Sequence, residues 1–304
     1  VQTCALPICN MERKLLILDT NALFHRSRNA LKRGAGELTT SWGQTVTGSY
    51  GVLSTLFSIL EKETYDSVLP VYDAGGNFRK KESEEYKANR GATDDSFKSD
   101  FTLLKDELLF YLGFNPVGIK GYEADDVIAS VAKSAVAFSH VDILTCDRDL
   151  LGCVSDRVNV VLFNSAKKVR RVDVDGVLDI FGVRPAEVRF LKSLSGDASD
   201  NVQGIKGIGD KTAAKILIEC RSGLDDDFTM ADRIVMHPKV RDHADTFLSN
   251  LRVVTMVDDL DVKWFANTPP LESVVRSVFE QSEFGSFLKE ARFKKICKAL
   301  GVVQ

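Results

Sequence analysis

The stretch KLLILD, residues 14–19, is a short apolar run that ends on an acidic residue. A continuous apolar run of this length predicts a strand that is buried on both faces. The stretches SVLPVYD (67–73) and VDILTCD (141–147) repeat the pattern and also end on aspartate. Apolar residues at helical spacing predict helices over 49–63, 97–113 and 123–138, and FNPVGI (114–119) is predicted to be a further strand. Strands that alternate with helices predict an α/β fold with a mostly parallel central sheet flanked by helices.

The pattern changes to helical after about residue 175. The segments VDGVLDIFG, PAEVRFLKSLSG and KTAAKILIEC all show helical spacing, and so do the segments beyond residue 228. The turn-forming residues GVRP mark a boundary near residue 183. We therefore expect an α/β core over residues 11–182, with a polar segment at 74–95, and a helical domain over residues 183–304.

The composition excludes several classes of protein. Of the 304 residues, 44% are hydrophobic and 27% are charged, and no apolar run approaches the roughly 18 residues that span a bilayer. The six cysteines form no CxxC pair and the four histidines are scattered, so a zinc site or a disulfide scaffold has little support and a reducing cytosol is the simplest compartment. The net charge is −3, so a nucleic-acid surface has to come from local basic clusters.

The first ten residues, VQTCALPICN, do not fit the rest of the chain. They lack the charged start and the long apolar run of a signal peptide. We expect residues 1–10 to be a non-native leader, with Met11 as the natural start.

Nine acidic residues fall where this topology can bring them together. In open α/β sheets ligands bind beyond the carboxyl ends of the strands. The acids at or just after strand ends, at the start of the helix in GYEADDVIAS (121–130) and in GDASDN (196–201) are Asp19, Asp73, Asp147, Asp149, Glu123, Asp125, Asp126, Asp197 and Asp200. A convergent set of carboxylates needs cations, and oxygen ligands without His or Cys favour Mg²⁺ or Mn²⁺. Two such ions are a recurrent device for cleaving phosphodiester bonds.

Each of these acids also has a simpler reading. An aspartate at a strand end often caps the next helix, acids in a first helical turn are favoured by the helix dipole, and GDASDN alone is typical of a turn. These simpler explanations account for each acid alone, but they do not explain why all nine occupy positions that this topology can bring together.

The stretch GIKGIGDKTAAKIL (204–217) predicts a phosphate-binding element. Its glycines let the backbone approach a phosphate, and the N–H groups at the start of the following helix bind one. The residues concerned are Gly204, Lys206, Gly207, Gly209, Lys211 and Lys215. With a first helix at 185–195 they resemble a helix-hairpin-helix that grips the DNA backbone. The alternative is a glycine-rich helix cap.

The stretch FRKKESEEYKANR (78–90) interleaves basic and aromatic residues. Arg79, Tyr86, Lys87 and Arg90 belong to it. Such a composition suits single-stranded nucleic acid, and it also suits a solvated linker.

Several motifs, in the family's order, make residues 14 to about 220 similar to the 5′-nuclease (flap endonuclease-like) superfamily. The resemblance is closest to bacteriophage 5′–3′ exonucleases and to the 5′-nuclease domain of bacterial DNA polymerase I. The motifs are LDTNALFHR, VYDAGGNFR with EYKANR, GYEADDVIA, LTCDRDLLGCV and LSGDASDNVQGIKGIGDKTA. The resemblance implies a PIN-like 5′-nuclease core, an arch or clamp over the 5′ strand at 74–95, and a helical DNA-binding domain.

The resemblance also implies roles for single residues. It implies that all nine acids are metal ligands, with Asp197 and Asp200 on the side of a second metal ion. It implies that Arg26 faces the scissile region and that Lys87 and Arg90 contact the phosphate near the cleaved bond, with Arg79 also available. The implied cofactors are two Mg²⁺ ions, which Mn²⁺ can replace, and K⁺ at the hairpin.

The resemblance implies a structure-specific 5′→3′ exonuclease and 5′-flap endonuclease that removes RNA primers or flaps in phage or bacterial DNA replication. The expected substrates are branched or 5′-flap DNA and RNA-primed DNA. A monomer in the cytoplasm of a bacterium or phage-infected cell is expected, with no membrane contact and with a single-strand binding protein as a partner. Two alternatives are a catalytically silent protein that binds branched DNA and a PIN-type ribonuclease.

Overall fold

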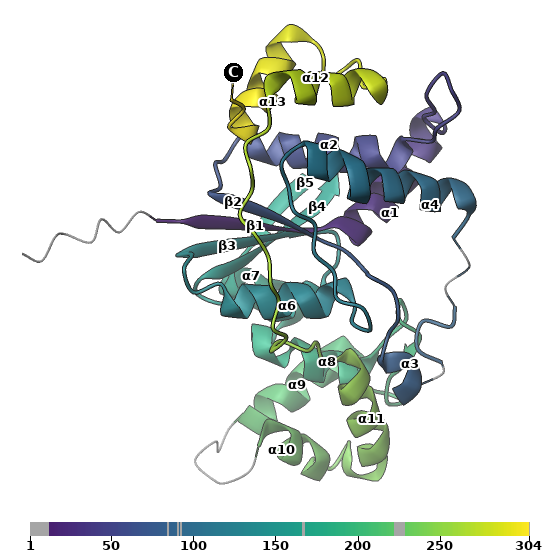
Figure 1. The fold of residues 1–304 in the computed structure, drawn as a ribbon. Helices are drawn as coiled ribbons and strands as arrows, with labels where there is room; N and C mark the ends of the chain where they lie inside the picture. The colour runs from purple at the N-terminus through teal and green to yellow at the C-terminus, as the bar shows by residue number, and fades with distance from the viewer. Residues whose placement is uncertain are drawn as a thin grey trace, which may run out of the picture.

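A five-stranded sheet forms the centre of the protein (Figure 1). The computed structural model describes residues 12–83, 85–89, 91, 93–165, 168–221 and 229–303. The strands are β1 (Lys14–Asp19), β2 (Ser67–Val71), β3 (His140–Thr145), β4 (Val158–Ser165) and β5 (Lys168–Val172), in the order β2-β1-β3-β4-β5. Neighbours are parallel except β4 and β5, which are antiparallel. The predicted α/β class and mostly parallel sheet are confirmed.

Side chains of β1 alternate between two hydrophobic cores, one on each face of the sheet. Leu15 and Ile17 belong to one core, and Leu16 and Leu18 to the other. All four are fully buried, because helices cover both faces. The continuous apolar run KLLILD is the sequence signature of this arrangement.

The first face is covered by a helix that leads into the helical part of the chain. The elements on this side are α6 (Ala124–Ser134), the 3-10 helix η2 (Asp149–Cys153), α7 (Val174–Phe181), the 3-10 helix η3 (Pro185–Glu187), α8 (Val188–Ser195), α9 (Asp210–Arg221), α10 (Met230–Met236), the 3-10 helix η4 (Arg241–His243) and α11 (Ala244–Val254). One core runs without a break from Ile17 in β1 to Leu217 in α9 and Phe247 in α11. The sheet and the helical part are therefore packed on each other.

The second face is covered by helices from both ends of the chain. They are α1 (Thr20–Ala35), α2 (Thr47–Leu60), a continuous helix made of α4 (Asp95–Thr102), the π-helical η1 (Leu103–Leu108) and α5 (Leu109–Tyr111), and then α12 (Glu272–Gln281) and α13 (Glu290–Leu300). Phe57 of α2 contacts the rings of Phe279 and Phe287, with centroids 6.0 Å and 5.4 Å away.

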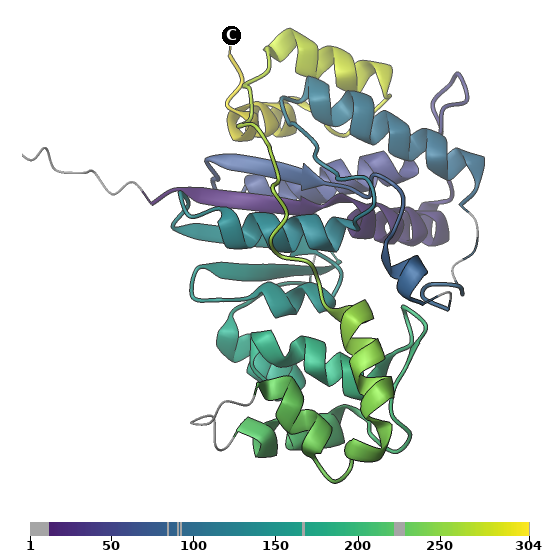
Figure 2. The same cartoon turned by 60° about the horizontal axis from the view of Figure 1, so that its bottom comes forward.

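This packing differs from the predicted domain division. Residues 183–304 were expected to form one helical domain, but α12 and α13 lie on the second face of the sheet, far from α8–α11 (Figure 1). An extended segment, residues 256–270, connects the two groups and is called the strap. Figures 1 and 2 both show it running from α11 past α6 to α12. Apolar periodicity alone cannot tell which core a helix will join.

The predicted strand at 114–119 is wrong. Only Val117 pairs with β2, through one bridge to Val71. Pro70 in β2 has no N–H to donate to the carbonyl of Asn115, so the pairing does not extend in that direction. On the same edge of the sheet, the strap residue Asn267 hydrogen-bonds the backbone N–H and carbonyl of Val68 in β2, at 2.5 Å and 2.7 Å.

Other elements follow the predictions more closely. The helices predicted at 49–63, 97–113 and 123–138 correspond to α2, to α4 with η1 and α5, and to α6. The segment at 74–95, the arch segment below, contains one short helix, α3 (Arg79–Glu82). Residues 1–10 lie outside the described residues. Within the described part of the chain, no helix combines the length and the apolar character needed to cross a membrane.

Candidate active site

Five acidic residues line one cavity at the carboxyl ends of the adjacent parallel strands β2, β1 and β3. Asp19 is the last residue of β1, and Asp73 and Asp147 each lie two residues beyond the end of β2 and β3. Glu123 and Asp125 come from the start of α6. The cavity measures about 600 Å³ and is also lined by Asn21, His25, Lys87 and Thr93. The expected convergence of these five acids is seen in the structure, and their role as metal ligands stays a prediction.

Hydrogen bonds hold the carboxylates of Asp19 and Asp73 in place. Asp19 caps α1 by accepting from the backbone N–H of Ala22 at 3.1 Å, and its other oxygen accepts from the hydroxyl of Thr145 at 2.6 Å. Asp73 accepts from the backbone N–H of Ala124 at 2.6 Å, and its own N–H donates to Asn21 at 2.9 Å. The helix-cap reading of a strand-end aspartate is thus true of Asp19, and the same carboxylate still faces the cavity.

The cavity concentrates negative charge. Burial, opposed by the hydrogen bonds from Thr145 and Ala22 and reinforced by the nearby carboxylates of Asp147 and Asp73, raises the pKa of Asp19 to about 7. Burial and the neighbouring Asp19 and Asp147 raise the pKa of Asp125 well above its ordinary value. Carboxylates in such an environment are stabilised by a cation.

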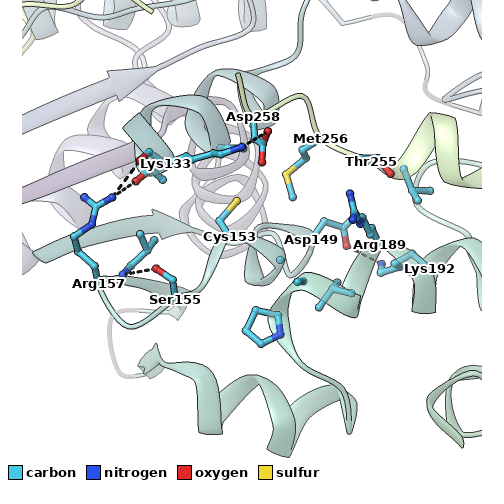
Figure 3. Close-up of a pocket in the computed structure, with 18 residues that line it drawn as sticks. Lys133, Asp149, Cys153, Ser155, Arg157, Arg189, Lys192, Thr255, Met256 and Asp258 are labelled. Atoms are coloured by element: carbon cyan, nitrogen blue, oxygen red, sulfur yellow. Dashed lines mark hydrogen bonds and ion pairs between the residues drawn. The ribbon is translucent and has the colours of Figure 1, made fainter. Parts of the chain in front are cut away.

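A second acidic group lies beside the first and is bridged by a lysine. The Nζ atom of Lys192, from α8, lies 2.7 Å from Asp149 and 2.6 Å from Asp197. Figure 3 shows Lys192 joined to Asp149 in this way. Burial and the charge of Asp147, opposed by Lys192, raise the pKa of Asp149 to about 7. Although burial acts in the opposite direction, hydrogen bonds from Lys192 and Ser199 hold the pKa of Asp197 below its ordinary value.

Lys87 connects the arch segment to Glu123 of the first acidic group and to Asp200. Its ammonium group contacts Glu123 and lies 3.5 Å from Asp200. Its backbone N–H donates to the carbonyl of Asp200 at 2.9 Å, and its φ of 55° is unusual for a residue other than glycine. Two carboxylates thus hold the side chain of Lys87 at the cavity, while its backbone adopts a conformation that costs free energy. Such backbone conformations cluster at functional sites.

Tyr86, which belongs to the stretch expected to suit single-stranded nucleic acid, is not available for stacking on a base. Its side chain is only 4% exposed, and its hydroxyl lies 2.8 Å from Glu123 and 3.0 Å from Asp200. These two hydrogen bonds fix the buried side chain of Tyr86 in place. Burial and the charges of Glu123 and Asp200 raise the pKa of Tyr86, so its hydroxyl stays protonated.

Arg79 and Asp126 also differ from their predicted roles. Arg79 was expected to contact phosphate and Asp126 to bind a metal ion. Instead they form a bidentate ion pair with N–O distances of 2.7 Å and 2.6 Å, in which Arg79 is 3% and Asp126 0% exposed. The strong pairing of two buried charges leaves neither group facing the cavity.

Arg26 and Arg90 are the two other basic residues expected near the scissile phosphate, and Arg26 does not line the cavity. Arg26 is exposed on α1, beside the cavity residue His25, and its guanidinium donates to the carbonyl of Asn164, with Nε at 3.1 Å. Arg90 lies outside the described residues. The cavity residues Asn21 and His25 were not predicted; their position in the first turns of α1, after Asp19, is the signal that would have found them.

The predicted hairpin lies between α8 and α9. It contains the short antiparallel strands β6 (Gly196–Asp197) and β7 (Val202–Gln203). A Cβ atom on Gly204 would lie 2.2 Å from the backbone of Ser195, so only glycine lets the hairpin close. Gly207, with a φ of 85°, and Gly209 have open space around them. The exposed lysines around the hairpin and the start of α9 are Lys206, Lys211 and Lys215.

The donor atoms fit a hard divalent cation. All the acids in the two groups offer carboxylate oxygens, which Mg²⁺ and Mn²⁺ prefer. In the described part of the chain, no group of three or more His, Cys, Asp or Glu side chains is arranged to hold a metal ion as it stands. Lys87 and Lys192 neutralise the acids in this arrangement, so their ammonium groups occupy positions where cations are favoured.

Comparisons with known families agree with this geometry. A family model described as "5′-3′ exonuclease, N-terminal resolvase-like domain" matches residues 14–182, more than half of the chain. A second, described as "5′-3′ exonuclease, C-terminal SAM fold", matches residues 183–275. The chain belongs to the 5′-3′ exonuclease family. The resemblance stated from its motifs is thereby confirmed.

Curated relatives of this 5′-3′ exonuclease chain include bacterial DNA polymerases. The thermostable DNA polymerase I of Thermus thermophilus is 36% identical over 94% of this chain and 34% of its own length. That of Thermus aquaticus is 35% identical over 97% of this chain and 35% of its own length. The DNA polymerase I of Mycobacterium tuberculosis is 36% identical over 67% of this chain and 23% of its own length. The chain spans about a third or less of these relatives.

Solved structures share the fold of this 5′-3′ exonuclease chain. A structure of the T5 5′-exonuclease with bound divalent metal ions (zinc) matches with a TM-score of 0.62 and 20% identity, over 95% of this chain and 98% of the other. The catalytic core of Rad2 in complex with DNA substrate matches with a TM-score of 0.58 and 16% identity, over 95% and 93%.

Proposed function

We propose that this chain is a divalent-metal-dependent 5′-nuclease that acts on branched DNA. It combines 5′→3′ exonuclease and 5′-flap endonuclease activity, leaves a 5′-phosphate and a 3′-hydroxyl, and removes RNA primers or flaps during replication. The observation that carries the proposal is the convergence of Asp19, Asp73, Glu123, Asp125 and Asp147 in one cavity beside Lys87. Membership of the 5′-3′ exonuclease family supports it.

The proposed cofactors are two Mg²⁺ ions, with Mn²⁺ as a substitute. The five cavity acids form the first ligand set, and Asp149, Asp197 and Asp200 belong to the second. Bound metal ions would supply an activated water molecule and stabilise charge on the reacting phosphate. Asp126 is left out of the ligand sets, because both of its oxygens accept from Arg79 and from backbone N–H groups.

The basic residues at the cavity act on the phosphate. Lys87 reaches the cavity from the arch segment and stabilises negative charge on the scissile phosphate. Arg26 and Arg90 are assigned to the same phosphate region from the motifs alone. Binding of DNA releases Lys87 from Glu123 and Asp200, because a phosphate offers it a new anionic partner.

The hairpin and its lysines hold the duplex backbone. Gly207 and Gly209 are open to a phosphate, and Lys206, Lys211 and Lys215 add positive charge around the start of α9. A K⁺ ion bound at this hairpin, action as a monomer in the cytoplasm, and cooperation with a single-strand binding protein complete the proposal. The proposed DNA-binding part is residues 183–255, and the proposed nuclease core includes the returning helices α12 and α13.

The test is cleavage of a labelled 5′-flap substrate in Mg²⁺. Asp125→Asn should lose cleavage and keep flap binding in EDTA. Asp156→Asn, which alters an exposed carboxylate in the turn before β4, is the matched control and should cleave like the wild type. Binding without any Mg²⁺-dependent cleavage would instead identify a silent branched-DNA-binding protein. Cleavage confined to single-stranded RNA would identify a PIN-type ribonuclease.

A further inference from the structure

The guanidinium of Arg79 connects three separate segments of the chain. Its Nε–H donates to the carbonyl of Val253 at 2.7 Å, and one terminal nitrogen donates to the carbonyl of Thr255 at 2.9 Å. The two terminal nitrogens donate to Asp126 at 2.6 Å and 2.7 Å, and one of them also reaches Glu123 at 3.3 Å. One buried side chain thus ties the arch segment to the start of α6 and to the end of α11.

Asp126 extends the connection to the strap. One of its oxygens also accepts from the backbone N–H of Val257 at 2.8 Å, and the other from the N–H of Glu123 at 3.1 Å. Figure 3 shows Thr255, just before the strap, and the strap residues Met256 and Asp258 lining one pocket with Lys133 of α6 and Lys192 of α8. The ion pair is therefore located where the nuclease core, the arch segment and the helical part meet.

Glu123 is held by three residues of the arch segment. Arg79 and Tyr86 both donate to its Oε2, at 3.3 Å and 2.8 Å, and Lys87 contacts its Oε1. When Lys87 leaves for a phosphate, the contact with Arg79 remains. A fixed guanidinium behind a metal-ligating carboxylate orients that carboxylate, as partners behind ligands generally do.

We propose that Arg79 is a positioning residue of the nuclease site. It orients Glu123 for metal binding and locks the arch segment, α6 and the end of α11 into one unit, and it does not touch DNA. The inference rests on the proposed function, because Glu123 matters as a metal ligand only in a metal-dependent nuclease. Only arginine fits, since a lysine ammonium lacks the planar fork that serves Asp126, Val253 and Thr255 at once.

Arg79→Lys keeps the charge and removes the fork. Mn²⁺ binding, measured by calorimetry in the absence of DNA, should weaken by about 10–100-fold, the usual loss when a partner behind a metal ligand is altered. Single-turnover flap cleavage should fall at low Mn²⁺ and recover in part at high Mn²⁺. Flap binding in EDTA should stay at the wild-type level.

Arg157→Lys is the matched control. Arg157 donates to the carbonyls of Ala132 and Ala135 at the other end of α6, as Arg79 does to those of Val253 and Thr255, and it does not line the cavity. Both variants should lose thermal stability, and only Arg79→Lys should lose Mn²⁺ affinity. Equal Mn²⁺ affinity in the two variants would overturn the inference. It would leave the proposed nuclease function intact, because cleavage by the wild type tests that function separately.

A wild-type measurement decides the case if Arg79→Lys fails to fold. Mn²⁺ binding should slow hydrogen exchange of the Val257 amide, which is linked to Glu123 through Asp126, both by the N–H of Glu123 and by Arg79. An unchanged Val257 exchange rate would overturn the inference. So would an Arg79→Gln variant that binds Mn²⁺ normally but lowers the salt dependence of flap binding by about one phosphate contact. A wild type that binds no Mn²⁺ would overturn the proposed function together with the inference.

Discussion

The Nζ atom of Lys192 lies 2.6 Å from the carboxylate of Asp197, and it lies 2.7 Å from that of Asp149. This lysine is therefore an internal counter-cation for two acids that the proposal assigns to the second metal site. Removing it as Lys192→Gln should destabilise the metal-free protein by about 3 kcal/mol, because two partly buried carboxylates lose their partner. The same variant should gain more thermal stability from Mn²⁺ than the wild type does.

Thermal unfolding with and without Mn²⁺ measures both effects. Lys294→Gln is the control, because Lys294 pairs with Glu290 on the exposed surface of α13. A Lys192→Gln variant that unfolds like the wild type in EDTA, with no larger response to Mn²⁺, would show that Lys192 carries no such role.

Lys87→Ala should reduce turnover far more than binding. A well-placed donor to developing negative charge contributes about 10²–10³-fold to the rate, and the side chain of Lys87 lines the cavity. Single-turnover cleavage and flap affinity measured on the same substrate separate the two effects. Lys294→Ala should behave like the wild type in both, and a Lys87→Ala rate close to the wild-type rate would contradict the assignment.

Lys206→Ala and Lys211→Ala should weaken binding of duplex DNA regardless of its sequence. Each exposed lysine that contacts a phosphate contributes about one unit to the slope of log affinity against log salt. Titration of a flap substrate at several salt concentrations measures that slope, with Lys294→Ala as the reference. An unchanged slope in both variants would place the duplex away from the hairpin.

Asp100→Ala should destabilise the core without affecting the active site. The buried carboxylate of Asp100, in α4, accepts from the backbone N–H of Gly48 at 2.6 Å and from the hydroxyl of Ser49 at 2.5 Å, at the start of α2. Losing the cap and leaving these groups unpaired costs about 3 kcal/mol. Urea unfolding measures the loss, and Asp95→Ala, at a fully exposed position of the same helix, should cost far less.

The stability difference between the wild type and Asp100→Asn should depend on pH. Burial, opposed by hydrogen bonds from Ser49 and Gly48, raises the pKa of Asp100 above its ordinary value of 3.8. A carboxyl with a raised pKa favours the folded state most below its unfolded-state pKa, and this contribution is lost as the pH rises through the folded-state value. We would measure urea unfolding at a series of pH values that starts below 3.8. As the pH rises, the free energy of unfolding of the wild type should fall relative to that of Asp100→Asn. A pH-independent difference would contradict it.

The strand-end acids could be predicted from the sequence because their positions follow from local rules. Three apolar runs ending near Asp19, Asp73 and Asp147 are enough to place these side chains at one edge of a parallel sheet. The start of α6 was equally clear, since acids cluster in the first turn of a strongly apolar helix.

The roles of Arg79 and Tyr86 could not be predicted in the same way. A basic and an aromatic residue in a polar stretch look solvent-exposed, and the partners that bury them are far away in the sequence. Arg79 donates to Val253, 174 positions later, and Tyr86 to Asp200, 114 positions later. The position of α12 and α13 escaped prediction for the same reason, because their apolar faces fit either core.

The return of α12 and α13 to the second face of the sheet has a consequence for how the protein is made. A ribosome delivers α2 early, and the aromatic rings that cover Phe57, those of Phe279 and Phe287, arrive only with the last helices described here. During synthesis the apolar side chains of α2 that contact these rings, such as Phe57, therefore stay exposed until α12 and the residues after it have emerged. The last strand of the sheet ends at residue 172, but its second face is covered in part by helices that start at residue 272, so we expect a nascent fragment that ends before residue 272 to bind chaperones.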